Sequence, residues 1–135
     1  MALNPHFLLA TRNTMLNDIT TSLGTSCIFN IYAGGQPADV SSATTAGNVV
    51  VAAPTFPSTN AFGAASGGVL RANTITSDSS AVGGTAAWFS ICKSTGARVI
   101  DGSVGTSGAD LNLNSVTITT GAAVAITAFT VTFAA

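Results

Sequence analysis

The sequence contains very few charged side chains. Glutamate is absent, lysine occurs once, and charged residues make up 7% of the 135-residue chain. The four lysine and arginine residues are scattered, whereas a protein that neutralises nucleic-acid phosphates needs several in a cluster. No hydrophobic run approaches the roughly 20 residues that span a bilayer. We therefore expect neither nucleic acid nor a membrane as partner, and a surface covered by hydroxyl and amide groups or by a bound protein.

Cysteine and histidine are also scarce. Cys27 and Cys92 lie far apart in the sequence, which fits neither a zinc-binding spacing nor a disulfide scaffold. Both lie in apolar, strand-like runs, so we expect two buried free thiols in a protein that folds in a reducing cytoplasm. His6 is the only histidine and has no cysteine or carboxylate close to it in the sequence. We expect it to be solvated or packed, and we expect no metal and no cofactor.

The sequence offers no convincing catalytic set. Asp101 and Asp110 flank a glycine-rich loop and could form the carboxylate pair of a glycoside hydrolase. The favoured interpretation is that both are turn residues that bond the nearby backbone. The run from Lys93 to Gly96 is similar to part of a phosphate-binding loop, but Cys92 stands where that motif requires glycine. We expect a hairpin turn there, no catalytic residues, and a protein that is not an enzyme.

Residues that are present in quantity indicate one helix followed by many strands. Asn4 as cap, Pro5 in the first turn and Gly24 as stop predict a helix from Pro5 to Leu23. Its apolar residues recur at spacings of three, four and seven, and we expect it to dock on the rest of the protein through them. The predicted docking residues are Leu16, Ile19 and Leu23.

Beyond the helix the apolar pattern has a period of two. Predicted strands cover 27–32, 48–53, 69–75, 86–92 and 97–104, with the last two joined by a hairpin turn. The alternation slips by one residue near Asn114-Ser115 and again near Thr127-Ala128. A slip of one residue turns every following side chain to the other face, so we expect bends there and a chain that crosses between sheets.

These elements predict a single domain over residues 1–135, with an N-terminal helix in 1–24 and a β body in 27–135. Its length permits a hydrophobic core without disulfides or metals. Several short strands with frequent turn signals favour a mainly β fold. We expect an antiparallel β-sandwich or jelly-roll-like body with one N-terminal α-helix.

The segment from Ala53 to Gly68 is too apolar for an ordinary solvated loop, although proline and glycine interrupt it. It either folds back to cap the core or forms a contact arm for a partner. A second apolar patch lies near the N-terminus. On the contact-arm interpretation, the candidate interface residues from the two patches are Phe7, Leu8, Pro54, Phe56, Pro57 and Phe62.

Several short segments occur in a characteristic order after the N-terminal helix and its Leu-Gly turn. They are Ile28–Pro37 (IFNIYAGGQP), Phe62–Gly68 (FGAASGG), Gly84–Phe89 (GTAAWF), Asp101–Val104 (DGSV) and Asp110–Asn114 (DLNLN). This order covers most of the chain and resembles a family of small virion proteins of tailed bacteriophages and prophages. The resemblance implies a structural role without catalytic residues, and among such roles we favour a capsid decoration, or cement, protein.

For a cement protein, the partners are the major capsid protein and further copies of this chain. The location is the capsid exterior of the virion, after assembly in the host cytoplasm. An uncharged Ser/Thr/Asn surface suits many modest contacts repeated on a symmetric lattice. The alternative is a tail-associated or fibre module that binds carbohydrate through Asn/Asp-rich loops and exposed aromatic side chains. Capsid co-sedimentation and glycan-array binding distinguish these two functions, and loss of activity on changing Asp101 or Asp110 to Asn would indicate an enzyme.

Overall fold

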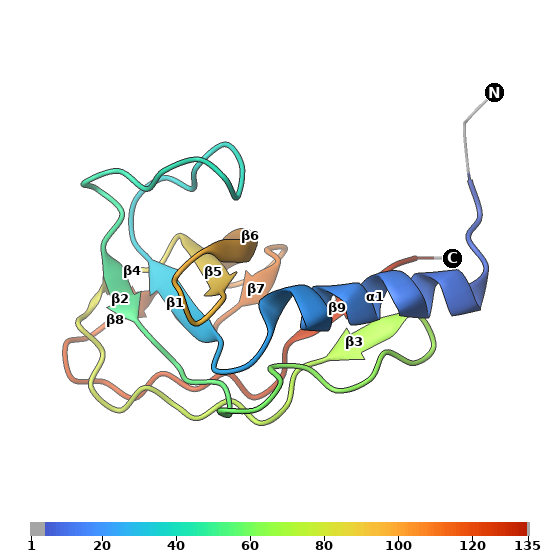
Figure 1. The fold of residues 1–135 in the computed structure, drawn as a ribbon. Helices are drawn as coiled ribbons and strands as arrows, with labels where there is room; N and C mark the ends of the chain where they lie inside the picture. The colour runs from blue at the N-terminus through green and yellow to red at the C-terminus, as the bar shows by residue number, and fades with distance from the viewer. Residues whose placement is uncertain (1–4, 135) are drawn as a thin grey trace.

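The computed structural model describes residues 5–134 and has a mainly β body with one helix (Figure 1). Its sheets are short, curled and mixed in direction. In chain order the elements are α1 (Leu9–Leu23), β1 (Ile28–Tyr32), β2 (Val50–Ala52), β3 (Val69–Arg71), β4 (Gly84–Thr85), β5 (Trp88–Cys92), β6 (Arg98–Gly105), β7 (Leu111–Asn112), β8 (Thr117–Ile118) and β9 (Thr130–Thr132).

The largest sheet has the strand order β2-β1-β5-β6-β7. Its strands pair antiparallel except for β7, which runs parallel to β6. The turn between β5 and β6 is the predicted hairpin: Lys93 N–H donates to Ala97 O, and Gly96 has a φ of +88°. Glycine adopts such a positive φ without steric cost, so this turn was identifiable from the sequence. The central strand β5 is buried along its whole length.

The inner face of this sheet carries an aromatic core. Five phenylalanine rings form a connected cluster with centroid separations between 5.3 and 6.1 Å. The rings belong to Phe29, Phe56, Phe62, Phe89 and Phe129. Each aromatic pair contributes about 0.5 to 1.5 kcal/mol beyond the burial of apolar area. The cluster joins the first half of the β body to the chain just before β9.

Helix α1 begins at Leu9, four residues after the predicted start at Pro5. Residues 5–8 are exposed, so extending the helix into them would bury no apolar surface, and short helices depend mainly on such packing. Leu8 occupies the cap position and provides no side-chain hydrogen bond, while the predicted cap Asn4 lies outside the described residues. The helix ends as predicted, with Gly24 N–H donating to Thr20 O.

The predicted docking face of α1 is confirmed in its main residues. Leu16 and Leu23 are buried in the core, and Ile19 is half-buried against it. Polar bonds add to this contact along β3 and β9, beside which the helix lies (Figure 1). Arg12 Nη1 donates to Phe133 O at 3.0 Å, and Asn13 Oδ1 accepts a hydrogen bond from Gly68 N at 2.9 Å.

The chain crosses between sheets in its last third, as the two phase slips predict. Strand β7 belongs to the five-stranded sheet, β8 pairs with β4, and β9 pairs with β3. At each predicted bend two consecutive residues are exposed, namely Asn114-Ser115 and Thr127-Ala128, and the buried positions resume out of step after them. The predicted change of face is therefore confirmed at both positions, and the chain bends at Asn114.

Some strands are shorter than predicted. Strand β3 ends at Arg71, because the next residues pair elsewhere: Ala72 forms a bridge with Phe62, and Thr76 forms one with Thr55. The short strand β4 was not predicted, since the Gly-Thr pair that forms it has no apolar alternation. No helix in residues 5–134 is long and apolar enough to cross a membrane.

Candidate interaction surface

The six predicted interface residues separate into two groups in the structure. Phe7 and Leu8 are 52% and 74% exposed. Pro54, Phe56 and Phe62 are buried in the core instead, while Pro57 is half-buried. The prediction that Pro54, Phe56 and Phe62 contact a partner is therefore wrong, because a partner cannot reach these buried side chains without unfolding the segment. Segment 53–68 folds back onto the core instead.

The N-terminal end of α1 is an exposed apolar surface. Phe7, Leu8 and Leu9 are consecutive, and Met15 lies one or two turns further along the helix with 40% exposure. The leading backbone N–H groups of a helix have no intrahelical partners, and at α1 no side chain caps them. This end of the helix has the apolar area and the free donors of a surface that binds another chain.

A groove of about 520 Å³ lies along residues 111–128, between β7 and the chain before β9. The buried or half-buried apolar side chains that line it are Leu111, Leu113, Ile118, Val124 and Ile126. None of the lining residues is charged. The sequence does not predict this groove. The phase slips at 114–115 and 127–128 predict only that the chain leaves one sheet for another at these positions.

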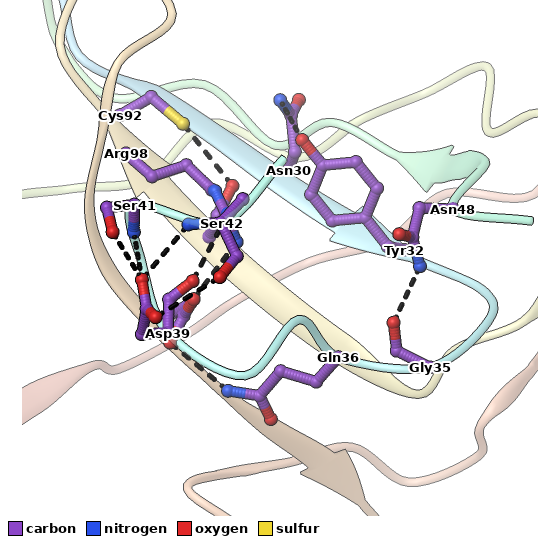
Figure 2. A network of polar contacts seen from close by, with 12 residues as sticks. Asn30, Tyr32, Gly35, Gln36, Asp39, Ser41, Ser42, Asn48, Cys92 and Arg98 are labelled. Carbon is purple, nitrogen blue, oxygen red and sulfur yellow. Dashed lines mark hydrogen bonds and ion pairs between the residues drawn. The ribbon is translucent and has the colours of Figure 1, made fainter. Parts of the chain in front are cut away.

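A network of polar contacts covers the outer face of the five-stranded sheet (Figure 2). The rings of Tyr32 and Trp88 stack at a centroid separation of 4.1 Å, and the Arg98 guanidinium lies 5.4 Å from the centre of the Trp88 ring. Arg98 also donates to the carbonyl oxygens of Asp39 and Ser42 in the loop between β1 and β2. The network fastens this loop to the sheet and leaves Tyr32 and Trp88 buried.

Three aspartates stabilise turns and loops by accepting hydrogen bonds from the backbone. The Ser41 hydroxyl and N–H donate to Asp39 and lower its pKa. The Ala53 N–H does the same for Asp78, and the Ser103 N–H for Asp110. Hydrogen bonds to a carboxylate favour its charged form, so all three are held ionised.

Asp101 and Asp110 each accept hydrogen bonds from neighbouring residues of loops and strands. A general acid needs a raised pKa, whereas the Ser103 bonds lower the pKa of Asp110. Asp101 accepts hydrogen bonds from Arg98 at 3.0 Å and from Gln36 at 3.1 Å. Both carboxylates are thus engaged in holding loops. Within residues 5–134 no three His, Cys, Asp or Glu side chains are grouped as metal ligands would be.

The two cysteines are buried free thiols, as predicted. Cys92 Sγ lies 3.3 Å from the Ser90 hydroxyl on β5, and Cys27 Sγ lies 3.5 Å from Gly24 O. Burial raises the pKa of the Cys27 thiol, because desolvation disfavours the thiolate. A buried, protonated thiol is a poor nucleophile, and this one serves packing at the end of α1.

No family model, no curated protein and no solved structure matches the chain. The function is therefore inferred from the surfaces of this chain itself, of which the apolar N-terminal end and the uncharged groove are the two that a partner could occupy.

Proposed function

We propose that this protein is a non-enzymatic structural protein of a bacteriophage virion, a cement protein that attaches to the capsid exterior. In this role it binds the major capsid protein and stabilises the lattice as a homo-oligomer. The observation that carries the proposal is the exposed apolar end at Phe7, Leu8 and Leu9 on a protein with so few charges. Exposed apolar residues in a row, surrounded by polar surface, are typical of protein contact sites.

The chemistry of the remaining surface supports attachment by many weak contacts. Charged residues make up 7% of the chain, so hydroxyl and amide groups supply most of its polar surface. Individual contacts of this kind are modest, but repeated copies on a lattice increase the effective concentration of each. Electrostatic steering contributes little in such a system, and we expect attachment to vary little with salt.

In this proposal the β body is a spacer held together by its core. Its aromatic cluster connects β1 and β5 with the chain before β9. In this proposal the body is a β-sandwich in which one layer is the five-stranded sheet and the other contains β3 and β9. The contacts of Phe29 and Phe89 with Phe129, which lies just before β9, support this layering.

The carbohydrate-binding alternative gains no support from the aromatic residues. Sugar-binding modules present ring faces to solvent, but Tyr32 and Trp88 are buried and their rings stack on each other. Among the described aromatic side chains Phe7 is the most exposed, and it lies on the apolar end of α1.

Co-sedimentation with capsids lacking decoration tests the proposed function. The purified protein should pellet with capsids up to a fixed number of copies per capsid subunit, and it should do so equally at low and high salt. A glycan array run in parallel tests the alternative. Failure to pellet with any capsid, together with glycan binding, would remove the cement assignment.

A further inference from the structure

The groove along residues 111–128 has unpaired backbone on both sides. On one side β7 is the edge strand of the five-stranded sheet and pairs only with β6. On the other side, residues 125–128 make no hydrogen bonds through their peptide groups to the described part of the chain. Unpaired peptide groups beside a sheet edge are a template for an added extended segment. The groove therefore has the backbone chemistry to receive a strand.

The lining of the groove indicates what kind of segment it receives. Ile118, Val124 and Ile126 line the groove and are each less than 10% exposed. The polar lining residues are Thr, Ser and Asn, so the groove is mixed in polarity and uncharged. An entering segment must then be uncharged, because a charged side chain would be partly desolvated there without an ionic partner.

The chain itself contains a segment with these properties. Residues 5–8 precede α1 without helical structure, and the backbone of Leu8 is extended, with φ −55° and ψ 139°. Phe7, Leu8 and Leu9 are all at least 45% exposed, and no residue from 7 to 11 is charged. Residues 7–11 and the groove lining are both uncharged, so contact between them would bury no ion from these residues. The extended backbone at Leu8 can align with an edge strand.

This segment cannot fill the groove of its own chain. The start of α1 lies at one end of the molecule, while β8, inside the groove region, lies at the opposite end (Figure 1). We infer that the apolar segment at residues 5–9 of one copy binds in the groove at residues 111–128 of a second copy, giving a head-to-tail assembly. The inference rests on the proposed function for its role, since such an assembly supplies the multivalency of a cement protein. Self-association itself is measurable without a capsid.

The contact is small, which sets the expected strength of association. A fully buried aromatic side chain removes about 150 to 250 Å² from water, and Phe7 is already about half covered. A segment of five residues therefore stays below the roughly 1,000 Å² typical of a stable interface. Association in solution should be reversible and concentration-dependent. Closure of a ring, or a capsid lattice that holds copies side by side, would strengthen it.

Oligomeric state is the first test. Sedimentation velocity on the wild-type protein over a wide concentration range should show a rising average mass. The double variant Phe7→Ser with Leu8→Ser should remain monomeric at all concentrations. Its matched control is Val40→Ser with Val49→Ser, which removes two apolar side chains of 39% and 50% exposure from another surface. The control should associate like the wild type, and unchanged Trp88 emission should confirm that each variant is folded.

Cross-linking between two different variants tests the position of the contact. Ala10→Cys protein, whose new thiol lies next to the binding segment, is mixed with Thr127→Cys protein and oxidised mildly, while the buried Cys27 and Cys92 provide little background. The mixed disulfide should form at least roughly tenfold faster than with Ser94→Cys, which places the thiol in the exposed hairpin turn, because bound copies raise the local concentration.

Three results would overturn the inference: a wild-type protein that is monomeric throughout, association that persists without Phe7 and Leu8, or equal cross-linking at positions 127 and 94. A monomeric protein whose binding to capsids depends on Phe7 would show that the segment binds the capsid protein instead. That last outcome refutes self-association but leaves the proposed function intact. Self-association without capsid binding would support the head-to-tail contact and refute the proposed function.

Discussion

The burial of Phe62 predicts that this side chain serves folding rather than partner contact. Phe62 is 1% exposed, and its ring lies 5.9 Å from that of Phe56 and 6.1 Å from that of Phe129. Truncation of a buried phenylalanine to alanine costs about 3 to 5 kcal/mol, from lost transfer energy and the cavity left behind. Domains of this kind are stable by about 5 to 15 kcal/mol. We therefore expect Phe62→Ala to lose a large fraction of the free energy of unfolding.

Urea titration followed by the fluorescence of Trp88, the only tryptophan, measures this loss directly. At about 3 to 5 °C per kcal/mol for a chain of this size, the melting temperature should fall by roughly 10 to 20 °C. The matched control is Phe7→Ala, which removes the same side chain from an exposed position and should change stability by less than about 0.5 kcal/mol. A loss below about 1 kcal/mol for Phe62→Ala, or equal losses for the two variants, would refute the assignment of Phe62 to the core.

Three further predictions concern the helix, the thiols and a loop carboxylate. Leu16→Ala should lower the free energy of unfolding by about 2 to 5 kcal/mol in urea titration, because Leu16 is fully buried; a neutral result would show that α1 does not dock through it. Cys27 and Cys92 should react with a thiol reagent only after denaturation, yielding two thiols without reductant, whereas recovery of none would indicate a disulfide. Because bonds from Ser103 lower the pKa of Asp110 below its ordinary 3.8, the stability that this carboxylate contributes should be present above that pH and should be lost as the pH falls through the lowered pKa. Asp110→Asn should show a smaller fall than the wild type between pH 5 and pH 3, and an identical fall in both would remove the carboxylate from the pH dependence.

The strand pattern of the middle of the chain was predictable because its signals are local. The hairpin between β5 and β6 needs a glycine at one position with positive φ, and Gly96 supplies it between two alternating runs. The docking residues Leu16 and Leu23 followed from helical spacing alone. The changes of face near 114–115 and 127–128 were predictable because the alternation of apolar residues slips by one position at each.

The start of α1 and the fate of segment 53–68 were not predictable in the same way. Asn4 and Pro5 signal a helix start, but residues 5–8 have no surface of the protein to pack against, and the helix begins at Leu9. Pro54, Phe56 and Phe62 have the composition of either a contact arm or a core cap. The deciding contacts come from residues distant in sequence: Phe56 packs against Phe29, and Phe62 packs against Phe129. These contacts place the segment in the core.

By itself, the sequence determined the mainly β character, the single N-terminal helix, the reduced state expected of two isolated cysteines and the uncharged surface, because each depends on composition or on spacing along a few turns. Tertiary structure decided which apolar residues remained exposed. Phe56 and Phe7 are chemically identical, yet one is 3% and the other 52% exposed, since burial depends on which distant segments fold over a side chain. The groove at residues 111–128 is likewise a product of packing, because it forms where the chain passes from one sheet to the next and leaves the peptide groups of residues 125–128 unpaired within the described chain.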